Sequence, residues 1–226
     1  VVDYHPVNSY FHSMIERKIN KKLLEALADT PVILLHGARQ TGKSTLVKNL
    51  IKSDYDAKYL TFDDAGILSA AQNNPDEFLA AYEENIVLDE VQRVPEIFPA
   101  IKNLVDEKRK PGKFILTGSS NVLLVPKISE SLAGRMEILN LYPFSQSEIS
   151  GTDKNFVDEI FKKKYTFPKS LQKQKDLIDT TVTGGYPEML SRKSKQRQNA
   201  WFKSYITSIL QRDVRDISNI EKLNEL

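Results

Sequence analysis

Eight consecutive residues have the types and the spacing that phosphate binding requires. The segment Gly37-Ala38-Arg39-Gln40-Thr41-Gly42-Lys43-Ser44 matches the pattern G-x-x-x-x-G-K-[ST] in full. Glycines let the backbone adopt positive φ and approach a phosphate closely, and the turned backbone aims successive N–H groups inward. A helix beginning near Lys43 would add the positive end of its dipole. The pattern therefore predicts that residues 37–44 bind the phosphates of a nucleoside triphosphate.

Two side chains of this loop have specific expected roles. The Lys43 ammonium can reach the β- and γ-phosphates, and the Ser44 hydroxyl can ligate Mg²⁺. Arg39 and Gln40 are predicted to be loop residues that face solvent rather than catalytic groups. The apolar run VILLH at residues 32–36 supports this prediction, because a phosphate loop of this kind lies between a buried strand and a helix.

A second set of candidate residues ends an apolar run. The segment Ile86-Val87-Leu88-Asp89-Glu90 finishes in two carboxylates. In P-loop enzymes an aspartate at such a strand end holds Mg²⁺, usually through water. Glu90 would then polarise a water molecule for attack on the γ-phosphate, which indicates hydrolysis. Asp63-Asp64, after a less apolar run, is the rival pair. The sequence has no Asn-Lys-x-Asp motif, which argues against a preference for guanine.

Two further segments carry polar groups that could act on a phosphate. Ser119 follows the apolar run FIL and is the first candidate for a side chain that binds the attacking water or the γ-phosphate, ahead of Ser120 and Asn121. The alternative for these three residues is the capping of a turn. Arg135 is predicted to reach the γ-phosphate of a neighbouring subunit and to stabilise transition-state charge. An ordinary surface salt bridge is the alternative for this arginine.

The spacing of apolar residues predicts the elements that position these groups. Strands alternate with helices, and several strands are apolar without alternation, as expected of a parallel sheet covered on both faces. We therefore expect an α/β fold, a doubly wound and mainly parallel sheet of the P-loop NTPase type. The predicted strands are residues 32–36, 58–62, 86–89, 113–118 and 136–141, and the predicted helices are residues 11–28, 44–51, 75–84 and 97–108.

The alternation of strands and helices stops after residue 141. The segment YPFSQSE reads as a linker, and residues 176–183 and 199–214 have helical apolar spacing. We expect three parts: a P-loop ATPase core at 1–150, a small, mainly helical lid at 151–200, and the start of a truncated C-terminal domain at 201–226. The last residues, NIEKLNEL, read as a helix cut short, so we expect the chain to be a fragment of a longer protein.

Composition narrows the function classes. The sequence has no cysteine, which excludes disulfides, thiolate metal sites and a cysteine nucleophile, and its three histidines lack metal-ligand spacing. No apolar run approaches the roughly 18 residues that a spanning helix needs. The formal net charge is +2, so composition gives no strong argument for nucleic acid or membrane binding. We expect a soluble cytoplasmic protein without a membrane partner.

Several segments together resemble a known family. HGARQTGKSTL, IVLDEVQRVPEIFPAIKNLVDE, FILTGSSN, ESLAGRMEILNLYPFS and TGGYPEML are similar to the prokaryotic AAA-type ATPases that join an N-terminal ATPase core to a C-terminal domain of unknown function. The resemblance covers most of residues 10–220 and implies an AAA+-like core that uses ATP and Mg²⁺. It assigns Lys43, Ser44 and Thr45 to the first nucleotide motif, Asp89 and Glu90 to the second, Ser119 or Ser120 to the first sensor, and Arg135 to the arginine before the fifth strand.

The resemblance also places the segment Gly184-Gly185-Tyr186-Pro187 where related ATPases have a second sensor. Those relatives often carry an arginine shortly after the glycine, whereas here Glu188 stands nearby and Arg192 is the nearest basic residue. The resemblance implies an ATPase, the first of three candidate functions, without naming its task. A P-loop phosphotransferase is the first alternative. A nucleotide-sensing, nucleic-acid-binding module is the second, motivated by the basic residues Arg192, Lys193, Lys195 and Arg197, for which a solvated helix end is the simpler explanation.

Overall fold

A parallel five-stranded sheet forms the centre of the computed structural model, which describes residues 15–118, 132–152, 161 and 174–211. The strand order is β2-β3-β4-β1-β5, and every neighbouring pair is parallel. The carboxyl ends of the strands therefore meet at one edge of the sheet, which confirms the predicted α/β fold. The strands are β1 (Val32–His36), β2 (Ala57–Thr61), β3 (Asn85–Asp89), β4 (Phe114–Gly118) and β5 (Met136–Asn140).

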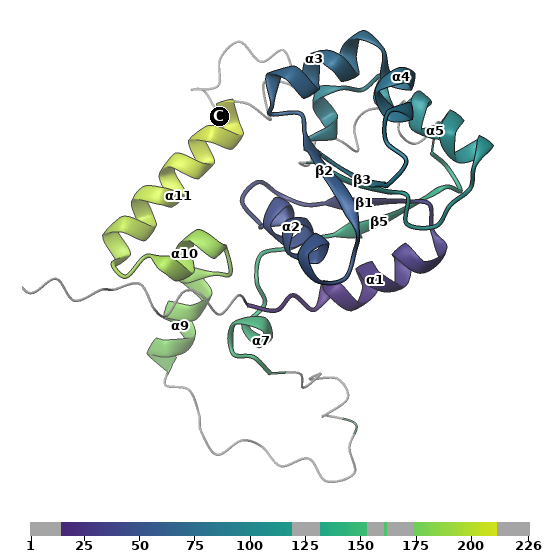
Figure 1. Cartoon of the computed structure of the whole chain (residues 1–226). Helices are drawn as coiled ribbons and strands as arrows, with labels where there is room; N and C mark the ends of the chain where they lie inside the picture. The colour runs from purple at the N-terminus through teal and green to yellow at the C-terminus, as the bar shows by residue number, and fades with distance from the viewer. Residues whose placement is uncertain (1–14, 119–131, 153–160, 162–173, 212–226) are drawn as a thin grey trace, which may run out of the picture.

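Helices cover both faces of this sheet (Figure 1). On one face, α1 (Ile19–Asp29) and α2 (Lys43–Ser53) pack on a core that includes Ile33 and Leu35. On the other face, the core that includes Leu34 is covered by α3 (Ala65–Asn73), α4 (Pro75–Ala80) and α5 (Ile97–Glu107). Successive residues of β1 thus enter opposite cores, which explains why this strand is apolar without alternation.

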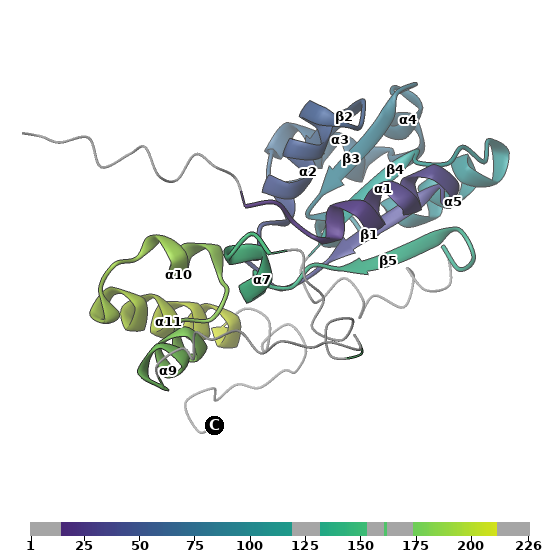
Figure 2. The same cartoon turned by 90° about the horizontal axis from the view of Figure 1, so that it is seen from below.

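A group of helices follows the sheet in the chain and lies beside it (Figures 1 and 2). After the short helix α7 (Gln146–Ile149), the group consists of α9 (Gln174–Thr183), α10 (Pro187–Ser191) and α11 (Lys195–Ile209). Trp201 and Tyr205 of α11 stack with ring centroids 4.8 Å apart and planes 9° apart. Phe144, which follows β5, donates its backbone N–H to the Gly185 carbonyl over 2.8 Å, and this bond ties the group to the sheet.

The structure corrects several predicted helix limits. Helix α1 begins at Ile19, because residues 15–17 have no regular structure, and residues 11–14 lie outside the described chain. Helix α4 ends at Ala80 instead of residue 84. Helix α11 begins at residue 195, four residues earlier than predicted, because the Ser194 hydroxyl caps it by accepting from the Arg197 N–H. The predicted extension to residue 214 lies partly outside the described chain.

Helix α3 has no counterpart among the predicted elements. Its first turn is stabilised by Asp64, whose carboxylate accepts hydrogen bonds from the N–H groups of Gly66 and Ile67. Aspartate is one of the residues that most favours this capping position. The domain limits at residues 150 and 200 stay predictions, and α11 runs continuously through the second of them.

Candidate functional site

The loop predicted to bind phosphate joins β1 to α2 at the carboxyl edge of the sheet. Gly42 precedes α2 with φ 96°, and Gln40 also has a positive φ of 60°. At the start of the loop, a Cβ on Gly37 would lie 2.3 Å from the Leu141 carbonyl oxygen, so only glycine fits against the segment after β5. The Thr41 hydroxyl closes the turn by donating to the Ala38 carbonyl over 2.9 Å. The loop therefore has the tight, turned backbone that its sequence pattern predicts.

Lys43, the first residue of α2, is buried under this loop. Its Nζ donates to the carbonyl oxygens of Gly37 over 2.8 Å and Ala38 over 3.0 Å. Burial lowers the pKa of Lys43 from its ordinary value, and the nearby carboxylates of Glu90 and Asp89 raise this pKa in the opposite sense. The loop follows β1 and the two carboxylates follow the line of β3 at the same edge of the parallel sheet, so the structure brings together the residues at 37–44 and at 89–90.

Asp89 ends β3 and is almost fully buried, with an exposed fraction of 4%. Both of its carboxylate oxygens accept hydrogen bonds, one from the Thr117 hydroxyl of β4 and the other from the Tyr59 hydroxyl of β2. Hydroxyl groups from the two strands that flank β3 therefore hold the carboxylate predicted to bind Mg²⁺.

Glu90 has φ 61° and ψ 45°, a left-handed conformation that is uncommon outside glycine. The turn η1 (Val91–Arg93) follows directly, and the Gln92 amide donates to the Glu90 carboxylate. A non-glycine residue in this conformation costs on the order of 1–3 kcal/mol and tends to occur at functional sites. The backbone thus turns sharply at the residue predicted to polarise the attacking water.

The other sequence candidates lie away from the loop or outside the described residues. Asp64 caps α3 and Asp63 pairs with Arg93 over 2.7 Å, so the rival acidic pair has other partners. Arg135 stands before β5, at the amino edge of the sheet, and pairs with Asp106. This pair is the surface salt bridge named as the alternative for this arginine, and the role toward a neighbouring subunit stays a prediction.

The remaining candidates lie outside the described residues or form ion pairs. Ser119, predicted to be the first sensor, lies outside the described residues, as do its alternatives Ser120 and Asn121. Arg192, the candidate for the second sensor, follows α10 and forms an ion pair with Glu188 over 2.7 Å. Lys195 of the basic cluster pairs with Asp179 of α9 over 3.0 Å.

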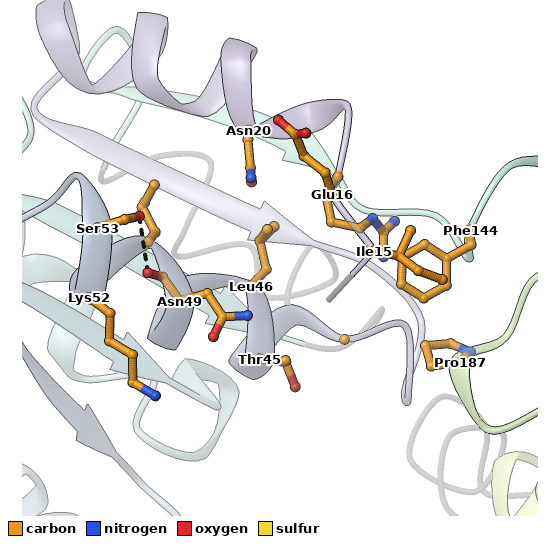
Figure 3. Close-up of a pocket in the computed structure, with 13 residues that line it drawn as sticks. Ile15, Glu16, Asn20, Thr45, Leu46, Asn49, Lys52, Ser53, Phe144 and Pro187 are labelled. Atoms are coloured by element: carbon orange, nitrogen blue, oxygen red, sulfur yellow. Dashed lines mark hydrogen bonds between the residues drawn. The ribbon is translucent and has the colours of Figure 1, made fainter. Parts of the chain in front are cut away.

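A pocket of about 420 Å³ opens beside the phosphate loop. It lies between the segment before α1, the outer face of α2, and Phe144 and Pro187 (Figure 3). The Asn20 amide points toward the pocket, and its Oδ1 is buried without a hydrogen-bond partner among the described residues. The lining is mainly apolar, and Gly42, Thr45 and Leu46 join it to the loop.

Arg17 connects this pocket to the loop, although no sequence pattern singles it out. Its guanidinium donates to the Thr41 carbonyl over 3.1 Å, to the Tyr142 carbonyl over 2.5 Å and to the Glu148 carboxylate over 3.2 Å. The same group lies 4.3 Å from the centre of the Phe144 ring. No spacing pattern in the sequence marks this arginine, because its partners are brought to it by the fold.

The strand order, the glycine loop between β1 and α2, and the acidic end of β3 together define a P-loop NTPase fold. A family model described as an AAA domain matches residues 29–150, which is more than half of the sequence. The chain therefore belongs to this AAA domain family, as the resemblance implied. A second model, described as a domain of unknown function (DUF8612), matches residues 174–226.

Individual relatives agree with this assignment. Uncharacterized proteins of Mycobacterium bovis and Mycobacterium tuberculosis are each 32% identical over 206 residues, which cover 90% of this chain and 41% of each relative. The chain thus spans about two fifths of the length of these relatives. The structure is similar to that of the Walker-type ATPase paby2304 of Pyrococcus abyssi, with a TM-score of 0.55, 18% identity, and coverage of 91% of this chain and 77% of that one.

None of the helices in the described part of the chain is long and apolar enough to cross a membrane.

Proposed function

We propose that this chain binds ATP together with Mg²⁺ and hydrolyses the bond between the β- and γ-phosphates. The observation that carries the proposal is the position of Lys43 at the end of a turned glycine loop after β1, at the same edge of the parallel sheet as Asp89, which ends β3, and Glu90, which follows it. A lysine at this place supplies positive charge to the phosphates, and the start of α2 contributes its free N–H groups.

The pocket beside the loop supports a nucleoside as the rest of the ligand. It shares Gly42 and Thr45 with the loop and has a volume of about 420 Å³, within the range of roughly 300–1,000 Å³ typical of small-ligand sites. Leu46 and Phe144 offer apolar surface to a flat base. The Asn20 amide can donate and accept at the edge of that base, which would satisfy its unpartnered oxygen.

The oxygen groups of Ser44 and Asp89 fit a magnesium ion. Mg²⁺ prefers oxygen ligands, keeps several waters, and is commonly held by one or two carboxylates together with substrate phosphates. Ser44 lies in the first turn of α2, after the glycine loop, and Asp89 ends β3 at the same edge of the sheet, which supports a shared ion site. When bound there, the ion would neutralise charge that develops on the phosphate oxygens.

Glu90 would accept the proton of the attacking water. Its backbone turns sharply directly after β3, and the Gln92 amide donates to its carboxylate. General-base groups typically contribute about 10²–10⁴-fold to a rate. We further propose that Arg135 acts across an interface between copies of the chain, since it lies at the amino edge of its own sheet.

Phosphate release with and without Mg²⁺, combined with direct ATP binding, tests the proposal. Glu90→Gln is expected to bind ATP as wild type does and to lose at least about 100-fold in turnover. Lys43→Ala is expected to lose binding as well. Glu25→Gln and Lys22→Ala are matched controls, because both residues are exposed on α1.

Three outcomes would count against the proposal. Folded wild-type protein that takes up no ATP in the presence of Mg²⁺ would refute nucleotide binding. Turnover unchanged in Glu90→Gln would remove that residue as the base. Phosphate release that stays at background until an acceptor molecule is added would indicate a phosphotransferase.

A further inference from the structure

The Gln92 amide donates a hydrogen bond to the carboxylate proposed to act as the general base. Gln92 is the middle residue of the turn η1, which follows Glu90 directly, and its Nε2 donates to Oε2 of Glu90. The backbone of this turn is well anchored. Val91 and Val94 are fully buried in the core, and the Val94 N–H donates to the Val91 carbonyl over 3.1 Å. The Gln92 side chain therefore extends from a firmly held piece of backbone.

The chemistry of the two groups fixes the direction of this bond. The oxygen and nitrogen ends of an amide are assigned from the groups around them. An ionised carboxylate only accepts hydrogen bonds, so the nitrogen end of Gln92 has to face Glu90. The oxygen end, Oε1 of Gln92, is buried and has no hydrogen-bond partner among the described residues. Within that part of the chain, the bond to Glu90 is therefore what orients the amide.

The bond also makes the two oxygens of Glu90 different from one another. Oε2 accepts from Gln92, whereas Oε1 accepts no hydrogen bond from the residues that the structure describes. Asp89 differs in this respect, because each of its oxygens accepts from a hydroxyl group, that of Thr117 or that of Tyr59. A general base has to present a lone pair to the proton that it removes. Of these four oxygens, Oε1 of Glu90 is the one that remains available to the attacking water.

We propose that Gln92 is a positioning residue for hydrolysis, which holds Oε2 of Glu90 and thereby directs Oε1 at the attacking water. A hydrogen bond to an ionised acceptor is shorter and stronger than one between neutral groups, so it can hold the carboxylate in one orientation. The inference rests on the proposed function, since it concerns the base of that reaction. The simpler alternative is a side chain that only fills space in the turn. That alternative predicts that an apolar side chain of similar length preserves turnover.

Variants of Gln92 that lack the donor test this role. Gln92→Met keeps the length of the side chain and removes its polar end, whereas Gln92→Ala removes the side chain as well. Both are expected to lower kcat for phosphate release by about 10–100-fold, because a reacting group misplaced by about 1 Å can cost roughly 100-fold. The dissociation constant of ADP with Mg²⁺, measured by calorimetry, should equal that of wild type, since the phosphate loop is unchanged. A loss in kcat without a loss in binding is expected of an interaction that serves the transition state.

Arg93→Ala is the matched control. Arg93 is the next residue of the same turn, and its guanidinium donates to the Asp63 carboxylate over 2.7 Å instead of to Glu90. Its kcat is expected to equal that of wild type. Urea denaturation followed by circular dichroism checks the fold of every variant. If Gln92→Ala is poorly folded, Gln92→Met decides, because it retains the bulk of the side chain.

The orientation of the Glu90 carboxylate provides a readout that does not depend on turnover. Crystal structures with ADP should show this carboxylate in one orientation in wild type and in another, or in several, in Gln92→Met. The same single orientation in both proteins would overturn the role of Gln92. In a double variant, Glu90→Gln and Gln92→Met should lower kcat by less than the product of the single effects, because Gln92 acts through Glu90. Full multiplicativity would contradict the inference.

The outcomes distinguish this inference from the proposed function. Folded wild-type protein that binds no ATP with Mg²⁺, or that binds it and releases no phosphate, overturns both. Turnover that is lost in Glu90→Gln and stays at the wild-type level in folded Gln92→Met overturns only the role of Gln92. Turnover that falls in Gln92→Ala and is preserved in Gln92→Met indicates space filling and overturns that role as well.

Discussion

Replacement of Arg17 by alanine is expected to destabilise the fold and to loosen the phosphate loop. The guanidinium and its partner Glu148 have side chains that are only 9% and 8% exposed. Removing one member of a buried ion pair typically costs about 3–5 kcal/mol, because the other charge stays buried. In the variant, the Glu148 carboxylate still accepts hydrogen bonds from the backbone N–H groups of Lys18 and Ser145, so the lower end of this range applies. We expect Arg17→Ala to lower the free energy of unfolding by about 3 kcal/mol.

The assay is urea denaturation followed by circular dichroism, with thermal unfolding as a second measure. For a chain of this size, 1 kcal/mol corresponds to roughly 2–4 °C in the unfolding midpoint, so a shift of about 6–12 °C is expected. Arg17→Lys should recover only part of the lost free energy of unfolding. An ammonium does not have the planar set of donors with which the guanidinium reaches the acceptors on Thr41, Tyr142 and Glu148 together.

An exposed ion pair provides the control. Arg93 and Asp63 have side chains that are 41% and 71% exposed, and such pairs contribute about 0–1 kcal/mol. Arg93→Ala should therefore stay close to wild type. If the free energies of unfolding of Arg17→Ala and Arg93→Ala differ by less than about 1 kcal/mol, the buried guanidinium does not support the loop. The reasoning from its three acceptors is then wrong.

Further predictions concern the core, the pocket and the helical group. Leu34→Ala, at a fully buried position of the central sheet, should cost about 2–5 kcal/mol in urea denaturation. Burial raises the pKa of Tyr55, so the folded state keeps the hydroxyl proton at a pH where the unfolded state has lost it. The free energy of unfolding therefore falls as pH rises above the ordinary pKa of 10.0. Tyr55→Phe should make this fall shallower in unfolding titrations. Tyr205→Phe removes the donor to the Arg39 carbonyl and should cost about 1 kcal/mol, read from Trp201 fluorescence in urea. Asn20→Ala should raise the calorimetric dissociation constant of ATP by about 5–10-fold, as expected for one lost hydrogen bond.

The sequence predicted the elements whose signals are local. Strands β1, β3 and β4 are short apolar runs, and the glycine loop constrains its own conformation, so these elements could be found from consecutive residues. Helix α3 was missed because its main signal is the cap at Asp64, which had been weighed as a candidate metal ligand. The same aspartate illustrates why paired carboxylates after a strand are ambiguous, since capping and metal binding use the same group.

The site residues that were missed depend on contacts between distant segments. Tyr59 lies within a run that was recognised only as a strand, and its partner Asp89 is thirty residues further along the chain. Arg17 meets Glu148 across a separation of 131 residues. Their roles depend on strand order and on the path of the chain after β5, and a single sequence carries no periodicity that reports either.

Several carbonyl groups of the phosphate loop accept hydrogen bonds from side chains outside the loop. Lys43 donates to the Gly37 and Ala38 carbonyls, while Tyr205 of α11 donates to Arg39 and Arg17 donates to Thr41. A loop whose carbonyls are engaged by donors in this way leaves its N–H groups available to bind an anion.

Two of these donors come from outside the loop and α2, so the loop's conformation and the docking of α11 share an energetic link. Coupling between two equilibria is reciprocal. If the docked Tyr205 raises nucleotide affinity by some factor, bound nucleotide raises the equilibrium constant for docking of α11 by the same factor. Binding at the loop is therefore expected to stabilise the contact with α11, and this contact provides a physical route from the nucleotide to the part of the chain that follows the sheet.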